Sequence, residues 1–470
     1  MQPNYAPNRR ALLAGLAALL AAGCDNGSLV EPRPAPPFEG VTLRVACPDP
    51  VAREVLAAHG KVWAATRGVK LDVVARPLGD VADADLGLIA PPEISRFAAS
   101  GQLDALPEAM RHPSHPYHFD RLSSAYRDKI LVWDGVPVAL PVLGEGFVMA
   151  YRKDRFAAAK LAPPATWDEF AAAAKHFGAG SLPPLPEGDD AFDREFFSVA
   201  ATLQRPATSS SDEASRPKTE ADANRLFAFH YDLVDGRSRL AQPAFVAALK
   251  WFQRVQEYRA KTPGEPVLWF ATLRELAALP PGSPVGVAPV PGSPVVHDFA
   301  TGEPKPTAVP INRVPYVGWG GAVGVVRKAS ANPEAAWDLL AYLGMAETTA
   351  PELIGAAKWG AGPTRPSQTD SLNQKFWAGY PLPPAERERL AAVLRDYVPS
   401  GLVNPVLRLR TPDQAEKVKA TAAILRKAIA DQGDAAAAMR GVEAAWAKLD
   451  EATPESERIA LYRRSLGLGK

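Results

Sequence analysis

Residues 133–170, WDGVPVALPVLGEGFVMAYRKDRFAAAKLAPPATWDEF, decide the fold class of this chain. A turn signal at 133–135 is followed by two apolar extended segments, which lie on either side of Gly144-Glu145-Gly146. Two glycines around a carboxylate mark a place where the backbone bends or approaches another segment closely. Thr166 is a predicted helix cap, because Glu169 follows three residues later and an apolar run continues from there. The stretch therefore predicts two extended segments joined by a bend and followed by a capped helix.

The segments before this stretch alternate between strand and helix patterns. Strands are predicted at 41–46, 69–75 and 85–89, and helices at 51–67 and 93–99. This alternation predicts an α/β fold with a largely parallel sheet. Ligands of such sheets lie beyond the carboxyl ends of the strands, so Asp49 and Glu93 are candidate ligand-facing residues. An ordinary role as loop or cap residues stays open for both.

Composition and charge exclude several classes of protein. The 470 residues include 53 Lys+Arg against 52 Asp+Glu, so the net charge gives no electrostatic reason to expect nucleic-acid binding. With 47% hydrophobic and 22% charged residues, the chain has enough apolar side chains for a sizeable core. Its 2 cysteines permit at most one disulfide, and its 47 prolines argue against an all-helical bundle.

The amino terminus has the layout of an export signal. Arg9-Arg10 precedes an apolar run that ends in Ala21-Ala22-Gly23, and Cys24 follows. This arrangement resembles the lipobox of bacterial lipoproteins, although Ala21 stands where that motif usually has Leu. We therefore predict a lipoprotein signal peptide at 1–23 and a lipid on Cys24, which would anchor the protein outside the cytoplasm on a bacterial membrane, in the periplasm or at the cell surface. A plain signal peptide cut elsewhere is the alternative. Residues 24–39 are proline-rich and predict an extended tether.

The rest of the chain divides into irregular and helical regions. Residues 178–216 are rich in Pro and Ser and predict a long surface excursion with one short helix at 196–203. A second irregular region, 280–310, encloses a predicted strand at 285–288. Helices are predicted at 245–258, 412–430 and 435–449, followed by a carboxyl-terminal tail at 451–470.

Several further blocks, taken in order, carry a resemblance to a known family. They are Gly318 to Val325 (GWGGAVGV), Ala331 to Trp337 (ANPEAAW), Gly362-Pro363-Thr364-Arg365 and Ala428 to Leu449. Together with residues 133–170 they resemble the extracellular solute-binding proteins of bacterial ABC importers, the family that includes maltose-binding proteins. The resemblance spans roughly residues 40–450.

This resemblance implies a two-lobed, type II periplasmic-binding-protein-like fold with the ligand between the lobes. Lobe one would comprise 40–145 and 322–352, and lobe two 146–321 and 353–450. The glycine-rich segments around Glu145 and Trp319 would be hinge crossings, since a hinge must absorb changes in backbone torsion. The resemblance implies a monomeric, non-enzymatic receptor that needs no cofactor. It would carry a small solute, most simply a sugar, to ABC permease subunits.

Candidate ligand-binding residues follow from the chemistry of sugars, which present apolar C–H faces and a rim of hydroxyl groups. Trp319 is the predicted stacking residue and Glu145 the predicted polar contact. Arg365 is expected near the mouth of the site, and Glu93 and Asp49 on the lobe-one side. The crossing glycines Gly318 and Gly320 complete the predicted set. Because carboxylates bind hydroxyls and cations equally well, the sequence does not separate sugars from amines.

Three other functions remain open at this point. His112, His115 and His118 lie within seven residues and could bind zinc or copper, although the prolines between them prevent a regular helix. The paired carboxylates Asp189 and Asp190 could be read as a glycosidase dyad, but no common catalytic motif accompanies them. A lipoprotein of the same fold could also act as a sensor or surface scaffold, or bind polyamines.

Overall fold

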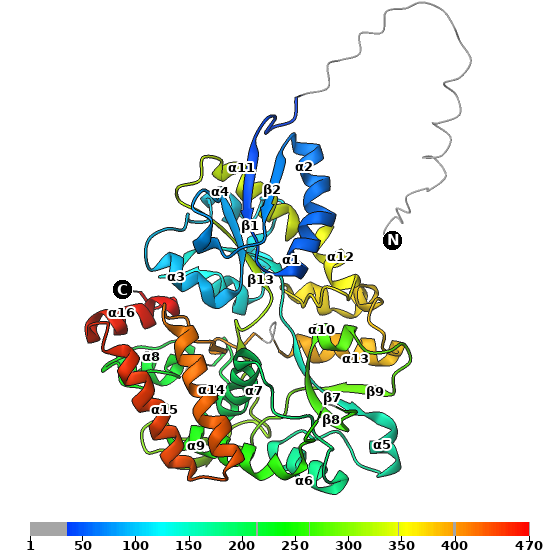
Figure 1. Ribbon diagram of the computed structural model, residues 1–470, viewed down its shortest axis with the longest axis vertical. Coiled ribbons are helices and arrows are strands. Elements are labelled where there is room, and N and C mark those ends of the chain that lie inside the picture. Colours follow the sequence, from blue (N-terminus) through cyan, green and yellow to red (C-terminus); the bar gives the residue numbers. More distant parts are fainter. Residues whose placement is uncertain (1–34, 213–214, 263, 346, 398–400, 470) are drawn as a thin grey trace, which may run out of the picture.

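The computed structural model describes residues 35–469, apart from 213–214, 263, 346 and 398–400, and it forms two α/β lobes stacked along the long axis (Figure 1). The predicted signal peptide, Cys24 and most of the tether lie outside the described residues. Cys47 is a buried free thiol. None of the described helices is both long and apolar enough to span a bilayer.

Lobe one contains a five-stranded sheet of order β2-β1-β3-β13-β6. The three strands predicted first, β1 (Thr42–Ala46), β2 (Lys70–Val74) and β3 (Leu86–Ile89), pair in parallel. From the second half of the chain, β13 (Ala322–Val326) enters between β3 and β6 (Leu140–Leu143), antiparallel to both. The predicted α/β class is therefore confirmed, and residues 322–326 join the strands of residues 42–143 in one sheet.

The helices of lobe one lie close to their predicted positions. The helix predicted at 51–67 is a continuous run of α1 (Pro50–Val55), a π-helical turn and α2 (Lys61–Arg67), which ends at Gly68 with a φ of 74°. After β3, a 3-10 turn (Pro91–Glu93) leads into α3 (Ile94–Ala98). On the sheet, α11 (Pro333–Leu343) packs against β6 and β13 and buries Trp337.

Lobe two is built on the antiparallel sheet β8-β7-β9, with β7 (Phe147–Arg152) between β8 (Leu268–Thr272) and β9 (Val285–Ala288). The cap predicted at Thr166 is present: its hydroxyl accepts from the Glu169 amide at 3.2 Å, and the Glu169 carboxylate accepts from the Thr166 amide at 3.1 Å. The helices of this lobe include α6 (Trp167–Phe177), α9 (Pro243–Val255), α13 (Pro384–Arg395), α14 (Gln414–Ala430) and α15 (Ala435–Asp450).

The prediction for residues 178–216 was wrong in its main element. Instead of a short helix at 196–203, the structure has α7 (Asp189–Gln204), a helix of 16 residues in the core of lobe two. Phe192, Phe196 and Val199 are fully buried on one face of α7. The prolines and glycines before residue 189 hide the start of this helix in the sequence. Gly188 is the N-cap, without a side-chain hydrogen bond, and the acidic first turn stabilises the helix through its dipole.

The segments that cross between the lobes lie against one another. Residue 144 pairs with residue 362 in an isolated antiparallel bridge, so a third segment joins the two predicted crossings. Gly321 has a φ of 76°, and a β-carbon there would collide with the Leu143 carbonyl. A β-carbon on Gly144 would likewise meet the Gly362 carbonyl. These positions require glycine because backbones pass at contact distance.

The last twenty residues, predicted as a tail, contain α16 (Glu455–Ser465), which docks on the body of the protein. The Tyr462 hydroxyl is buried and accepts from the Phe229 and His230 amides at 3.3 and 3.2 Å. The Asp134 amide donates to the Arg464 carbonyl at 2.9 Å. The helix therefore ties the 133–135 turn to the loop after α8 (Glu220–Phe227).

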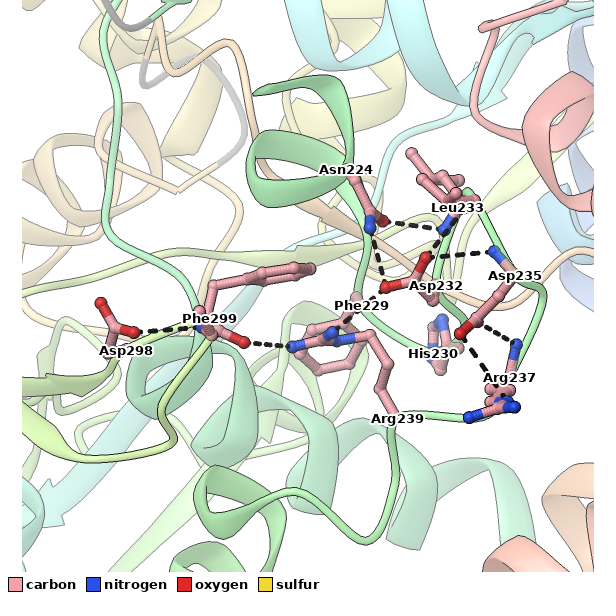
Figure 2. A network of polar contacts seen from close by, with 12 residues as sticks. Asn224, Phe229, His230, Asp232, Leu233, Asp235, Arg237, Arg239, Asp298 and Phe299 are labelled. Atoms are coloured by element: carbon pink, nitrogen blue, oxygen red, sulfur yellow. Dashed lines mark hydrogen bonds and ion pairs between the residues drawn. The ribbon is translucent and has the colours of Figure 1, made fainter. Parts of the chain in front are cut away.

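A polar network behind α8 fixes the shape of this part of lobe two (Figure 2). Asn224 donates to the Asp232 carboxylate at 2.7 Å and accepts from the Leu233 amide at 2.8 Å. Arg239 lies 3.5 Å from Asp232, and its guanidinium stacks 3.6 Å from the ring centre of Phe299. The network joins the turn after α8 to the loop that carries Phe299 and so holds these two segments together.

Candidate functional site between the two lobes

Asp49 follows β1 and Glu93 follows β3, at the carboxyl ends of these strands. One Asp49 carboxylate oxygen caps α1 by accepting from the Ala52 amide at 2.8 Å, and the other lies 3.9 Å from Arg274. Arg274 belongs to α10 (Leu273–Ala277), so this ion pair joins the lobes. Glu93 accepts from the Ala90 amide at 3.2 Å. Burial raises its pKa, and the negative charge of Asp190 in lobe two raises it further.

Glu145 is placed differently from its prediction. Its carboxylate accepts from three consecutive amides of the second crossing, Gly318 at 2.8 Å, Trp319 at 3.0 Å and Gly320 at 2.9 Å. Its own amide donates to the Tyr126 hydroxyl of lobe one at 2.9 Å. Glu145 is only 2% exposed, and this burial raises its pKa to about 7 against the pull of the three amides. The carboxylate is therefore a clamp between hinge segments, and the amides of the two glycines are occupied by it.

Trp319 is half-buried beside the clamp, with its ring held on several sides. The indole Nε1 donates to the Tyr397 hydroxyl at 2.8 Å, and Phe147 packs edge-on at 5.8 Å between ring centres. The Arg194 guanidinium lies 4.6 Å from the centre of the Trp319 ring. A guanidinium therefore occupies part of the aromatic surface on which a sugar was predicted to stack.

The α7 helix supplies functional candidates that the sequence reasoning missed. Asp190 accepts from Arg408 at 2.5 Å, and the same guanidinium lies 3.5 Å from the buried Asp193. Burial raises the pKa of Asp193 to about 6, and the Tyr316 hydroxyl donates to it at 2.9 Å. Arg194 follows Asp190 by one helical turn. The signal was in the sequence: with Phe192, Phe196 and Val199 spaced as one buried face, positions 190 and 194 fall together on another.

Arg365 is not at the mouth of the site. It is 1% exposed, and it donates to the backbone carbonyls of Tyr117 at 2.7 Å and His118 at 2.6 Å. Its guanidinium also lies 4.9 Å from the ring centre of Tyr117. Arg365 therefore fixes the 117–118 loop of lobe one, and its predicted role in binding a ligand is replaced by a structural one.

The histidine cluster does not converge. His112 Nδ1 pairs with the Ser114 hydroxyl at 2.7 Å, and His115 Nδ1 accepts from the Tyr117 amide at 3.2 Å. Within the described ranges, no group of three or more His, Cys, Asp or Glu side chains could hold a metal ion, so the alternative of a metal site at His112, His115 and His118 has no geometric support.

The carboxylates of Asp189 and Asp190 also act separately. Asp189 pairs with Arg426 at 2.5 Å, whereas Asp190 pairs with Arg408. They are therefore two capping ion pairs of α7, which leaves the reading as a glycosidase dyad without geometric support.

An apolar cavity of about 310 Å³ lies within lobe two, next to Phe147 and Tyr397, two residues that contact Trp319. Phe147, Tyr316 and Tyr397 form one wall, and the described residues of its lining all belong to lobe two. This cavity therefore differs from the lobe boundary, where the charged residues face one another. We assign the candidate site to the boundary because the ion pair between Asp49 and Arg274 and the charges of Glu93 and Asp190 meet there.

Part of the chain is similar to a known protein family. Residues 63–249 match the family described as bacterial extracellular solute-binding protein. The family consists of solute-binding proteins rather than enzymes. No curated protein matches the chain.

The same fold recurs in solved structures of solute-binding proteins. The maltose-bound MalE3 of T. maritima is 17% identical with a TM-score of 0.61, covering 87% of this chain and 100% of that one. The sugar-binding protein MalE of Xanthomonas citri is 17% identical with a TM-score of 0.63, covering 89% and 98%. A ribitol complex of an ABC transporter solute-binding protein from Agrobacterium radiobacter is 17% identical with a TM-score of 0.58, covering 88% and 100%. The chain therefore has the two-lobed solute-binding-protein fold that its sequence blocks predicted.

Proposed function

We propose that this chain is an extracytoplasmic receptor that captures a small solute between its two lobes and delivers it to an ABC importer permease. One observation carries the proposal: Asp49 and Glu93 of lobe one face Arg274 and Asp190 of lobe two. Charged groups from both lobes thus meet at a boundary whose crossings are glycine-rich. A solute that contacts both sides would favour the closed arrangement, and this differential contact is what drives hinge closure.

A carbohydrate or polyol is the solute class that we propose. Carboxylates accept hydrogen bonds from hydroxyl groups and guanidinium groups donate to hydroxyl oxygens, and the boundary presents both kinds. Solved structures of this fold contain maltose and ribitol, which are polyhydroxylated and uncharged. The same carboxylates would also accept a polyamine, which remains the second solute class to test.

The proposed location follows from the amino-terminal sequence. Removal of residues 1–23 would leave Cys24 as the first residue, and a lipid on it would hold the body on a bacterial membrane through the proline-rich tether. The first described residues fit this geometry, because Phe38 donates to the Arg67 carbonyl at 3.0 Å and brings the tether onto lobe one at the end of α2. We propose that the receptor works as a monomer.

Thermal unfolding of the full-length protein with single sugars, polyols and polyamines tests the binding function. A solute at a hundred times its Kd adds about 2.7 kcal/mol to the free energy of unfolding. With an unfolding entropy of about 2.1 cal/mol/K per residue over about 440 residues, this raises the Tm by about 3 °C. We expect such a shift with a sugar or polyol. A shift with polyamines alone would reassign the solute class, and no shift with any of them would overturn the proposal.

Transport and sensing are separated in cells. Deletion of the gene should abolish uptake of the radiolabelled solute identified by thermal shift. Re-expression of the wild-type chain should restore uptake. Normal uptake in the deletion strain would assign the protein to sensing or to a scaffold role instead.

The lipid anchor has its own test. A Cys24→Ser variant should lose incorporation of a radiolabelled fatty acid and appear in the soluble fraction after export. Wild-type protein that is equally soluble would rule out lipidation.

A further inference from the structure

The unusual group at the lobe boundary is Arg194 on α7. Its side chain forms no hydrogen bond and no ion pair with another described residue, and its Nε atom is buried without a partner, as is that of Arg408. Two neighbouring arginines of the boundary are matched, since Arg274 pairs with Asp49 and Arg408 pairs with Asp190 and Asp193. Arg194 is a boundary guanidinium whose hydrogen-bond donors are not satisfied by a side chain of the described protein.

Two aromatic rings hold this guanidinium in place. It lies 4.6 Å from the ring centre of Trp319 and 4.8 Å from that of Phe147. Both rings are themselves fixed, Trp319 by its hydrogen bond to Tyr397 and Phe147 by complete burial at the start of β7. Cation–π contacts of this kind immobilise an arginine without using its N–H donors. The planar guanidinium is therefore ordered before a solute binds, and its N–H groups remain available as hydrogen-bond donors.

The carboxylates near Arg194 do not use those donors. Glu145 is occupied by three backbone amides, and Asp193 by Tyr316 and Arg408. Glu195 lies 4.0 Å from Arg259. Arg194 interacts with these three carboxylates electrostatically and not through hydrogen bonds. Its guanidinium N–H groups therefore remain available to the carboxylate of a solute.

Arg194 lies beside the segments that cross between the lobes, because its charge acts on Glu145. Asp190, one turn earlier on the same face, lies close enough to lobe one for its charge to act on Glu93. Figure 1 shows α7 in the part of lobe two beneath lobe one. The guanidinium also lies against Trp319, the residue next to the crossing glycines. A solute held between Glu93 and the hinge would therefore meet Arg194.

We infer that Arg194 is an anion-recognising residue of the lobe boundary, and that the solute is a sugar acid whose carboxylate accepts hydrogen bonds from the Arg194 fork. This inference rests on the proposed function and narrows its solute class. Arginine matches a carboxylate with two parallel N–H···O bonds, and such charge-assisted bonds are about twice as strong as neutral ones. Glu93 and Asp49 would bind the hydroxyl groups of the same solute from lobe one.

Matched ligand pairs test the inference on the full-length protein by calorimetric titration. The probes are D-galacturonate against D-galactose, D-glucuronate against D-glucose, the corresponding disaccharides, and D-galactose 6-phosphate. We expect an acidic sugar to bind at least about 10-fold more tightly than its neutral partner, since a charge-assisted bond is worth more than a factor of ten. Arg194→Gln should weaken the acidic sugar by about 10- to 100-fold and change the neutral sugar by less than about 3-fold.

Two further variants keep the result interpretable. Arg194→Lys retains the charge without the planar fork and should restore only part of the affinity. Arg440→Gln removes the same charge from an exposed position of α15 and should leave both affinities unchanged. The Tm of each variant without solute shows whether it is folded, and the preference of the wild-type protein for acidic sugars does not depend on any variant.

The outcomes separate the two proposals. Preference for an acidic sugar that is lost in Arg194→Gln supports the inference. Equal or tighter binding of the neutral sugars, unchanged in Arg194→Gln, overturns the inference and leaves the proposed function intact. Preference for the sugar phosphate over the carboxylate overturns the assignment of a sugar acid. Binding of polyamines alone overturns the inference and reassigns the solute class of the proposed function. Absence of binding by every sugar, polyol and polyamine overturns the proposed function and the inference with it.

Discussion

Replacement of Glu145 by Gln tests whether burial or the hinge amides determine the pKa of the Glu145 carboxylate. Burial destabilises the ionised carboxylate, whereas the amides of Gly318, Trp319 and Gly320 stabilise it. The pKa of about 7 means that burial wins, because the usual value is 4.5. Between these two values the folded protein holds a proton that the unfolded chain has released, so the free energy of unfolding falls as pH rises.

The size of this effect follows from the same two values. The interval from 4.5 to about 7 corresponds to about 3 kcal/mol of stability lost between pH 4.5 and pH 8. Gln stays neutral throughout, so Glu145→Gln lacks this dependence. Its amide oxygen can accept from two of the three hinge amides, and the third loses its acceptor, which costs about 1–3 kcal/mol at every pH. We therefore expect the variant to be less stable than the wild type at pH 5, and the two to converge or cross by pH 8.

Guanidinium unfolding of both proteins at pH 5, 6, 7 and 8 measures this difference directly, and all other titrating groups cancel in it. Tyr126 and Tyr397, which lie near Glu145, stay protonated from pH 5 to pH 8 because burial raises their pKa values well above 10. Glu416→Gln at an exposed position of α14 is the matched control and should show no trend. If the wild type instead gains stability relative to Glu145→Gln as pH rises, the amides outweigh burial and the reasoning is refuted.

Three other substitutions test the hinge, the 117–118 loop and the core. In a urea titration, Gly321→Ala should lower the free energy of unfolding by more than about 1 kcal/mol, because alanine is strained at a φ of 76° and its β-carbon meets a carbonyl. Gly264→Ala is the control, because a β-carbon there meets open space. Arg365→Met should destabilise the protein by about 2–4 kcal/mol in that assay, since it leaves buried carbonyls unpaired, while solute selectivity by calorimetry stays unchanged; altered selectivity would return Arg365 to the site. His230 is buried with no hydrogen bond from either ring nitrogen within the described chain, and its pKa is held well below 6.5 by burial and by nearby Arg205 and Lys417. The folded state keeps His230 neutral, so the free energy of unfolding falls as pH drops below 6.5. Between pH 7 and pH 5 the Tm of His230→Phe should therefore fall less than the Tm of the wild type. An equal fall of the Tm in both proteins would contradict this.

The elements that the sequence predicted well are those whose signals are local. The strands β1, β2, β3 and β9 are short apolar runs between turn signals, and Thr166 with Glu169 forms a cap from residues three apart. Gly144 belongs to the stretch predicted to bend or to approach another segment closely, and the Gly362 carbonyl lies against it. Gly321 belongs to the predicted hinge crossing, and its close approach to the Leu143 carbonyl was not predicted. For α7 the local signal was misleading, because prolines and serines flank a helix whose stability comes from burial in lobe two.

The roles of single site residues were predicted less well, because they depend on partners far away in the sequence. The amides that hold Glu145 are 173 to 175 residues distant, and the carbonyls that hold Arg365 are 247 to 248 residues distant. A conspicuous polar residue beside a glycine-rich crossing is as well suited to fixing the hinge as to binding a solute. Only the structure shows that its hydrogen-bonding capacity is already used.

Solute selectivity depends on the donors and acceptors that the protein does not already use itself. Glu145, Trp319, Gly318 and Gly320 form one closed set at the hinge, so substitutions there should alter stability and closure before they alter solute choice. The groups that retain unused capacity lie on the lobe faces, with Glu93 on one side and Arg194 on the other. A closing receptor needs a hinge whose polar atoms are satisfied by the protein and lobe faces whose polar atoms are left for the solute. Closure is then driven by the solute and not by the protein alone.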